Sequence, residues 1–362
     1  MLNKYKPTGK LVSPKWTFLD NTENHPFDKA DVCCLGVAMD LTASYTKGTW
    51  YGPEAAIDAS HQIEYEVPLF HKPMTEHMQI HNLGILEYPK PTPSLTGKKL
   101  SKIMEGMVAD VKGFSKKAFD KGKLLMTFGG DHSIPNGIFQ AIAEQHGAGN
   151  VTVFHVDAHL DLRLAYEDQK YSHASILRNC RELGFPTIQV GIRDHISEEE
   201  ANYLERKKLG EWIYWCPTMP SQFYKDHAST LQQHPILKNL IPHGHLTSEQ
   251  IQKICGQIKT KYAYITIDCD GIDATEMPGT GTPLPHGLTL RTVEESIYAI
   301  IQHCKKNGVQ LLGFDINEIS PLMRKESRHY KSQDTVTAMT EMKVALLAYK
   351  ILFWQFVERF KN

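Results

Sequence analysis

Short apolar runs recur along the chain, each bounded by turn residues and separated from the next by a helix-length segment. The runs are continuous rather than alternating, which is typical of strands buried on both faces. We predict such strands at residues 32–38, 124–128, 151–156, 187–192, 262–267 and 310–314. Helices are predicted at residues 52–60, 101–121, 135–145, 172–183, 248–259, 292–306 and, as a long amphipathic stretch, 335–360. This alternation predicts an α/β fold in three layers, a mainly parallel sheet between helices.

The chain has no internal repeat and no low-complexity linker, so we predict one α/β/α domain over residues 31–362. Residues 1–30 form an N-terminal extension that leads into the first strand. The proline-rich residues 88–93 are expected to form a loop, and residues 213–245 an irregular insertion.

Charge and cysteine content exclude several classes of protein. The 362 residues carry 40 Lys and Arg against 41 Asp and Glu, so the basic surface that nucleic-acid binding requires is missing. No apolar window is long enough to span a membrane, and residues 1–16 have no signal-peptide pattern. The seven cysteines are scattered without a C-x-x-C pair. We therefore expect a cytoplasmic protein with reduced thiols.

Polar residues follow four of the predicted strands directly. The four segments are Gly129-Gly130-Asp131-His132-Ser133, Asp157-Ala158-His159-Leu160-Asp161, Asp268-Cys269-Asp270 and Asp315-Ile316-Asn317-Glu318. Open α/β sheets bind their ligands in the crevice beyond the carboxyl ends of the strands. We therefore expect these four segments to meet at one site.

Two of the segments have a spacing of two residues between their polar side chains. In an extended chain residues i, i+2 and i+4 point to the same side, so Asp157, His159 and Asp161 form one row. Asp268 and Asp270 form a second row. Carboxylates that face each other raise one another's pKa, and burial adds a desolvation cost. Such rows are costly unless cations lie between them.

Two divalent cations would balance the four carboxylates, since neither row contains a Lys or Arg. The four Asp with His132 and His159 supply enough ligands for two metals if some carboxylates bridge. Hard oxygens without a thiolate favour Mn²⁺ over Zn²⁺, although imidazole is also compatible with Zn²⁺, Fe²⁺, Co²⁺ or Ni²⁺. Cys269 points away from its row and is expected to pack in the core.

The motifs resemble a known family. Residues 129–133, 157–161 and 266–273 resemble the three signatures of the ureohydrolase superfamily, which includes arginase, agmatinase, guanidinobutyrase and formiminoglutamase. The run Pro278-Gly279-Thr280-Gly281-Thr282-Pro283 looks most like agmatinase. Weaker similarity extends the match over residues 30 to 360 or so. The resemblance implies an arginase-like fold and a homo-oligomer, a trimer or a hexamer.

The resemblance also implies a binuclear Mn²⁺ centre. One metal would be bound by His132, Asp157, Asp161 and Asp268, and the other by Asp157, His159, Asp268 and Asp270. Asp157 and Asp268 would bridge the two ions. A water bridging two such cations loses its proton near neutral pH, and the resulting hydroxide can attack a guanidino carbon to release urea.

Three catalytic residues are expected on the same grounds: His173, Glu318 and the metal ligand Asp161. Glu318 resembles the Glu that holds the guanidinium group in the family. His173 sits where the family keeps a proton shuttle, but it is followed by Ala174 where agmatinases more often have Gly.

The sequence leaves several substrates open. The 278–283 segment favours agmatine, hydrolysed to putrescine and urea, and Glu167 or Asp168 would then meet its distal ammonium group. Arg163 favours the alternative of an acidic substrate, such as formiminoglutamate or 4-guanidinobutyrate, because it could pair with a carboxylate. The Ser-Gly-Asn segment of arginases is absent, and free guanidine remains an alternative. His286 either shapes the mouth of the cleft or is an exposed loop residue.

Other classes fit less well. A one-metal deacetylase would lack the second set of ligands, and a catalytically inactive relative typically loses a ligand or the guanidinium-binding carboxylate. A dinucleotide-binding dehydrogenase would carry G-x-G-x-x-G after the first strand, which this chain does not.

Overall fold

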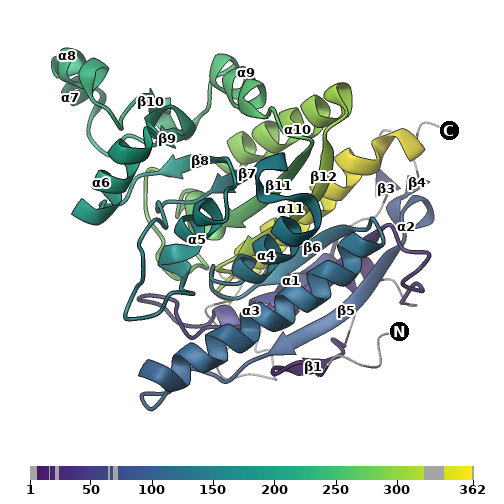
Figure 1. Ribbon diagram of the computed structural model, residues 1–362. Coiled ribbons are helices and arrows are strands. Elements are labelled where there is room, and N and C mark those ends of the chain that lie inside the picture. The colour runs from purple at the N-terminus through teal and green to yellow at the C-terminus, as the bar shows by residue number, and fades with distance from the viewer. Residues whose placement is uncertain are drawn as a thin grey trace.

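A ten-stranded sheet with helices on both faces forms the centre of the protein (Figure 1). The computed structural model describes residues 6–15, 17–20, 24–63, 66–67, 72–321 and 338–360. In spatial order the strands are β1 (Lys10–Val12), β5 (Ile80–Glu87), β2 (Val32–Ala38), β6 (Leu124–Gly129), β12 (Gln310–Asn317), β11 (Tyr262–Asp268), β7 (Val151–Val156), β8 (Thr187–Ile192), β9 (Ile213–Trp215) and β10 (Asn239–Leu240). All neighbouring pairs are parallel except β1 and β5, so the predicted α/β fold is confirmed.

The helices lie between the strands along the chain, and the longer ones cover the two faces of the sheet (Figure 1). They are α1 (Gly52–Ser60), α2 (Met74–His77), α3 (Gly97–Asp120), α4 (Pro135–His146), α5 (Ile176–Glu182), α6 (Glu198–Lys207), α7 (Ser221–Asp226), α8 (Ala228–Gln233), α9 (Ser248–Gln257), α10 (Leu290–Asn307) and α11 (Ala338–Phe356). A separate two-stranded sheet pairs β3 (Glu66–Val67) with β4 (Lys72–Pro73).

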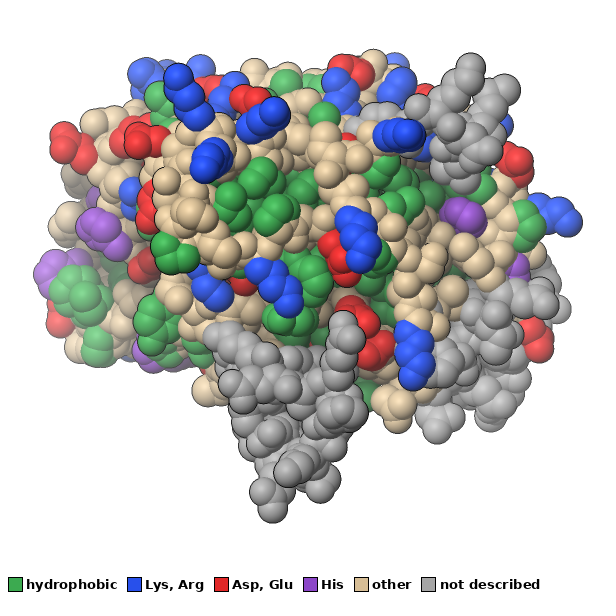
Figure 2. Space-filling model, turned by 90° about the horizontal axis from the view of Figure 1, so that it is seen from below, with side chains coloured by type: hydrophobic (Ala, Val, Ile, Leu, Met, Phe, Trp, Pro, Cys, Tyr) green, Lys and Arg blue, Asp and Glu red, His purple; other side chains and the backbone are tan. Residues whose placement is uncertain are grey.

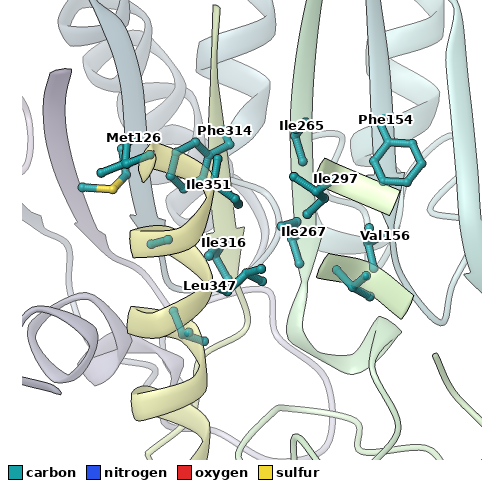
Figure 3. Packing of buried hydrophobic residues seen from close by; sticks show 14 of the residues in the cluster. Met126, Phe154, Val156, Ile265, Ile267, Ile297, Phe314, Ile316, Leu347 and Ile351 are labelled. Atoms are coloured by element: carbon teal, nitrogen blue, oxygen red, sulfur yellow. The ribbon is translucent and has the colours of Figure 1, made fainter. Parts of the chain in front are cut away.

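Hydrophobic side chains from the two faces of the sheet form two core clusters. Met126 and Phe128 point to the face that α1, α10 and α11 cover, whereas Leu125 points to the face that α3 and α4 cover. Figure 3 shows Leu347 and Ile351 of α11 beside the side chains of β12. The strands are therefore buried on both sides, which explains their continuous apolar runs.

The central strands were predicted within three residues of their ends, but the neighbouring strand β5 was missed. His81, Asn82 and Gly84 interrupt its apolar run, so the pattern there does not look like a strand. The backbone of Asn82 pairs with the side chain of Asn24, whose amide nitrogen donates to the Asn82 carbonyl at 3.0 Å and whose oxygen accepts from the Asn82 amide at 2.7 Å. Tertiary contacts thus stabilise a strand that local hydrophobicity does not predict.

The prediction of an irregular insertion at residues 213–245 was wrong in part. Two short strands within it, β9 and β10, extend the main sheet, and α7 and α8 lie between them. The preceding helix α6 was also missed, although Ser197 and Glu200 form a capping box at its start. The predicted helix at residues 172–183 is a 3₁₀ turn, His173–Ser175, followed by α5.

The N-terminal extension contributes an edge strand to the sheet. Just before β1, the backbone amides of Thr8 and Gly9 donate to Asp110 Oδ2 on α3, at 2.8 and 2.9 Å. The hydroxyl of Tyr88, the residue after β5, donates to the same oxygen at 2.7 Å. The described residues of this segment are thereby tied to the domain, and the domain limits of 31–362 stay a prediction. Residues 335–337 of the predicted last helix lie outside the described residues.

Surface charge is mixed on the face shown in Figure 2, where Lys and Arg side chains are interspersed with acidic ones and with hydrophobic patches. Among the described helices, none combines the length and the apolar character that a membrane crossing requires.

Candidate metal centre

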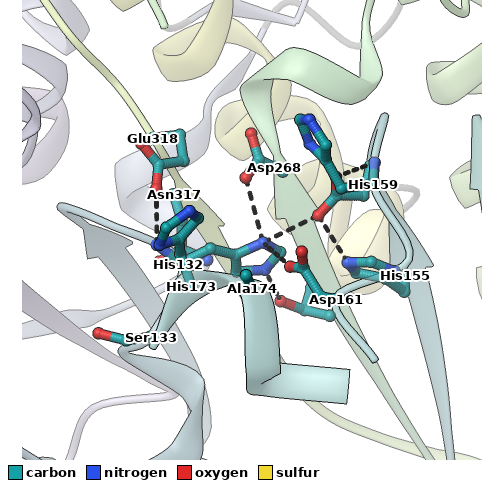
Figure 4. Close-up of polar contacts among 12 residues, drawn as sticks. His132, Ser133, His155, His159, Asp161, His173, Ala174, Asp268, Asn317 and Glu318 are labelled. Carbon is teal, nitrogen blue, oxygen red and sulfur yellow. Dashed lines mark hydrogen bonds and ion pairs between the residues drawn. The ribbon is translucent and has the colours of Figure 1, made fainter. Parts of the chain in front are cut away.

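The four polar segments meet at one edge of the sheet. They follow β6, β12, β11 and β7, which are consecutive neighbours in the sheet and parallel, so their carboxyl ends lie together. Figure 4 shows Asp161, Asp268 and Glu318 gathered around His132, with His155 and His159 beyond them. The four segments therefore meet at one place, as predicted.

The turn after β6 depends on a glycine. The Gly130 amide donates to the Val37 carbonyl at 2.8 Å, and its own carbonyl accepts from the Glu318 amide at 2.7 Å. A Cβ atom at this position would collide with the Met39 backbone, its carbonyl oxygen first. Only glycine at position 130 lets its backbone pack this closely against the chain at Met39 and Glu318. This packing fixes the position of the backbone that leads into His132.

His132 occupies the centre of the first half of the site. Its Nδ1 lies 3.1 Å from Asp157 Oδ2, 3.2 Å from Asp268 Oδ2 and 3.7 Å from Asp161 Oδ2. All four side chains are almost fully buried. Asp161 has a backbone φ of +53°, a left-handed conformation that is uncommon for a residue other than glycine and is held here by the surrounding chain.

The neighbours of His132 decide which ring nitrogen carries the proton. The Thr266 hydroxyl donates to Asp315 Oδ1 at 2.6 Å, so its oxygen is free to accept a hydrogen bond. His132 Nε2 lies 2.9 Å from that oxygen and therefore donates to it. Nδ1 is then left with a lone pair that points at the three carboxylates, as a metal ligand requires.

His159 has the same arrangement in the second half of the site. Its Nδ1 lies 3.3 Å from Asp157 Oδ1 and 3.2 Å from Asp270 Oδ2. Its Nε2 lies 3.2 Å from Asp194 Oδ2, which accepts the N–H and again leaves Nδ1 with a lone pair. Asp157 therefore presents one oxygen to each half of the site.

The electrostatics of the cluster match the expected need for cations. Burial and the charges of Asp270 and Asp157 raise the pKa of Asp268 well above its usual value, and burial and Asp157 do the same to the pKa of Asp161. Burial alone would lower the pKa of His132, but without a cation the facing Asp157 and Asp268 raise it well above its usual value, because they stabilise a second proton on Nδ1 that a metal ion would replace. Among the described residues, the ion pairs of these carboxylates are with histidines only. The donor set therefore fits two divalent cations.

Glu318 lies beside the cluster at the end of β12. It is 5% exposed, and its Oε1 accepts from the His132 amide at 2.9 Å, which orients the carboxylate. A Cβ atom on Gly281 would lie 3.1 Å from Glu318 Oε2, so the absence of a side chain there keeps this oxygen accessible. Burial and the charges of Asp268 and Asp131 raise the pKa of Glu318 well above its usual value.

Glu318 and the ligand candidates Asp268 and Asp270 line a cavity with a volume of about 220 Å³. His173 lines this cavity as well. Its Nε2 lies 3.0 Å from the Ser44 hydroxyl, and the ring of Tyr166 packs against it edge-on at 5.3 Å. Burial lowers the pKa of His173 to about 4, so the ring is neutral near pH 7.

Of the two residues predicted to bind the tail of the substrate, Arg163 lines the cavity and Asp168 does not. Arg163 lines the cavity, with its Nε 4.0 Å from Glu200 Oε2 and its guanidinium carbon 5.4 Å from the centre of the Tyr166 ring. Asp168 is exposed and does not line the cavity among the residues described. It sits instead in a tight turn in which Glu167 and Asp168 both have positive φ, so its role toward an ammonium group stays a prediction.

His286 also lies away from this cavity. It borders a separate surface hollow, together with His243 and Asp273. Cys269 is buried in a core cluster, as expected.

Sequence reasoning missed three residues that contact the cluster. His155 precedes Asp157 by two positions and so continues its row, a signal the spacing rule already contained. Thr266 stands in the same relation to Asp268. Asp194 follows β8 by two residues, and nothing in its local sequence indicates a contact with His159.

Comparisons with known proteins agree with this geometry. The arginase family model matches residues 30–234 and 240–350. The N(1)-aminopropylagmatine ureohydrolase of Synechocystis sp. is 28% identical over 353 residues, 95% of this chain and 96% of that protein. The protein of the same name from Thermus thermophilus is 30% identical over 297 residues, 82% of this chain and 85% of its own. An agmatinase of Bacillus anthracis is 26% identical over 303 residues, 83% of this chain and 87% of its own.

Solved structures share the fold. Agmatine ureohydrolase of Thermoplasma volcanium superimposes with a TM-score of 0.65 at 23% identity, covering 93% of both chains. Proclavaminate amidino hydrolase of Streptomyces clavuligerus gives a TM-score of 0.64 at 20% identity, covering 97% of this chain and 99% of that one. With the family model matching most of its length, the chain belongs to the arginase family.

Proposed function

We propose that this protein is a binuclear metal-dependent hydrolase that cleaves a guanidino C–N bond and releases urea, with agmatine as substrate and putrescine as the second product. The observation that carries the proposal is the pair of imidazole Nδ1 atoms that face four buried carboxylates, with Glu318 beside them. Relatives named agmatinase and N(1)-aminopropylagmatine ureohydrolase support it.

We divide the six proposed ligands into the two sets that the resemblance implies. The His132 side would hold one cation and the His159 side the other, with Asp157 presenting one oxygen to each. Asp268 faces His132, and its sharing between the two cations is proposed from the resemblance alone. We propose Mn²⁺ for both, since oxygen ligands dominate. Bound there, the cations would act as Lewis acids and make water a nucleophile near neutral pH.

The protein side chains bind the substrate and move its protons. Glu318 Oε2 would accept hydrogen bonds from the guanidinium group and hold its carbon above the cluster. His173, neutral because burial lowers its pKa to about 4, would take up at Nε2 a proton released by the attacking water and pass it to the leaving amine, with the Ser44 hydroxyl as the relay.

The cavity wall supports an amine-tailed substrate over an acidic one. The guanidinium of Arg163 faces Glu200 and the Tyr166 ring, so its charge is partly balanced by the protein. Asp194, whose side chain is 45% exposed, adds a carboxylate to the cavity lining. An extended amine such as N(1)-aminopropylagmatine is the second candidate, because the relatives that carry this name match most of the chain.

The test is urea release by the Mn²⁺-loaded protein from agmatine, N(1)-aminopropylagmatine, arginine, 4-guanidinobutyrate and guanidine, assayed in parallel. Formiminoglutamate contains no group that could form urea, so its hydrolysis is measured by its own product. The expected result is a kcat/KM for an amine-tailed substrate at least ~100-fold above the others, the difference of one well-placed charged contact. Preference for an acidic substrate, or no turnover of any, would overturn the proposal. A homo-oligomer, a trimer or a hexamer, and a cytoplasmic location are also proposed, and light scattering and cell fractionation test them.

A further inference from the structure

The buried His155 contacts the carboxylate shared by the two halves of the metal centre. It lies on β7, two residues before Asp157, with its side chain on the same face of the strand. The ring is fully buried, and its Nε2 lies 2.9 Å from Asp157 Oδ2. Neither the ligand sets nor the proposed proton path uses this residue.

The amide of Gln189 decides which nitrogen of His155 carries the proton. Gln189 Nε2 lies 3.0 Å from the Leu160 carbonyl oxygen, which can only accept, so the nitrogen of this amide must face it. The same Nε2 lies 3.2 Å from His155 Nδ1 and donates its second hydrogen there. Turning the amide round would bring two acceptor oxygens together. Nδ1 is therefore an acceptor, and the proton of the neutral ring is on Nε2.

With its proton on Nε2, His155 donates a hydrogen bond to Asp157 Oδ2. This oxygen is the one on the His132 side, 3.1 Å from His132 Nδ1, whereas Oδ1 faces His159. Oδ1 is fixed separately, because it accepts from the His159 backbone amide at 2.6 Å. The two oxygens of the shared carboxylate are thus held by two different donors, one in each half of the centre.

We infer that His155 is a positioning residue of the metal centre, whose Nε2–H, set by Gln189, orients the shared Asp157 carboxylate toward the metal on the His132 side. It is not itself a ligand, because its Nε2–H donates a hydrogen bond to Asp157 and its Nδ1 accepts one from Gln189. The inference rests on the proposed function only in taking the carboxylates as metal ligands. Loss of such an outer hydrogen bond typically weakens metal binding by 10- to 100-fold.

The test is a Mn²⁺ titration of the metal-free full-length protein, followed by calorimetry, with no substrate present. His155→Phe keeps a ring of similar size and removes the donor, and His155→Gln restores an N–H at about the position of Nε2. We expect His155→Phe to bind one of its two Mn²⁺ ions roughly 10- to 100-fold more weakly and the other unchanged, and His155→Gln to recover most of the loss. His146→Phe is the matched control, since the His146 ring packs on Tyr262 away from the centre.

Three outcomes would overturn the inference: unchanged binding of both ions by His155→Phe, equal weakening of both, or a His155→Gln variant as weak as the Phe variant. If His155→Phe does not fold, ¹⁵N NMR of the histidine rings in the wild-type protein decides the matter. A ring protonated at Nε2 alone supports the inference, and a ring with a proton on Nδ1 contradicts it. Because neither measurement involves turnover, a failure here is distinct from a failure to find urea.

Discussion

Replacing the Glu318 carboxylate by an amide should have opposite effects on catalysis and on stability. Oε1 of Glu318 is occupied by the His132 amide, so a guanidinium group pairs with Oε2 alone. In Glu318→Gln the carbonyl oxygen can serve only one of these partners. If it accepts from His132, the NH₂ group faces the cationic substrate, and if it turns round, the His132 amide loses its acceptor.

The magnitude follows from the burial of this carboxylate, which is 5% exposed. Removing one partner of a buried charge pair costs about 3–5 kcal/mol, so kcat/KM should fall by roughly 10²- to 10³-fold or more. The stability of the metal-free protein should rise instead. Burial and neighbouring carboxylates raise the pKa of Glu318, so its charged form destabilises the fold at pH 7, and a neutral amide relieves this.

Urea release under kcat/KM conditions and thermal unfolding of the metal-free protein measure the two effects. Glu294→Gln is the control, because Glu294 is a buried carboxylate on α10 that pairs with Lys350 away from the cavity. It should lose stability and keep its kcat/KM. A Glu318→Gln variant that keeps kcat/KM within about threefold of wild type, a change near the lower limit for one neutral hydrogen bond, would refute the predicted role of the carboxylate. A variant less stable than wild type without metal would refute the predicted effect on stability.

Three further predictions concern other contacts. Gly281→Ala places a methyl group 3.1 Å from Glu318 Oε2 and should raise KM about tenfold, because the side chain mildly overpacks the site. The amount of bound metal should not change, and an unaltered KM would contradict this prediction. Thr266→Val removes the oxygen that accepts from His132 Nε2 and should weaken metal binding about tenfold in a chelator competition. Equal affinity would argue against a His132 ring that carries its proton on Nε2. Although burial alone would raise the pKa of Asp31, its bonds to Arg359 and a backbone amide lower it below 3.8. Asp31→Asn should therefore cost about 0.5–1 kcal/mol at pH 7, and the difference from wild type in pH-dependent unfolding should vanish as the pH falls through that lowered pKa. A cost that persists in acid would contradict this.

The central strands could be predicted from the sequence because their burial on both faces requires continuous apolar runs. Residues 32–38 were predicted to the residue. β5 was not, since the backbone at its polar residue Asn82 pairs with the side chain of the distant Asn24, a contact that a local pattern does not contain. The insertion at residues 213–245 failed for a related reason: β9 and β10 have three and two residues, too few to form a pattern.

The site was predictable where its residues share a strand or follow a strand end. The parallel order of the sheet placed the four segments together, as predicted. The extended rows were wrong in detail, because the chain bends after β7, with Asp161 at a φ of +53°, and Cys269–Gly271 is a 3₁₀ turn. Contacts such as that of Asp194 with His159 depend on how loops from separate strands approach each other. Nor could the sequence distinguish the turn geometry of Asp168 from an inward-facing acid, because the positive φ is visible only in the folded chain.

The most direct test of the binuclear centre is urea formation measured against the number of Mn²⁺ ions bound per chain. The metal-free protein, with agmatine in excess, is reconstituted in steps, and bound metal and initial rate are determined on the same samples. The account predicts no turnover without metal and a rate that rises until two ions are bound per chain. Full activity with one ion, or no urea with two ions bound, would contradict it.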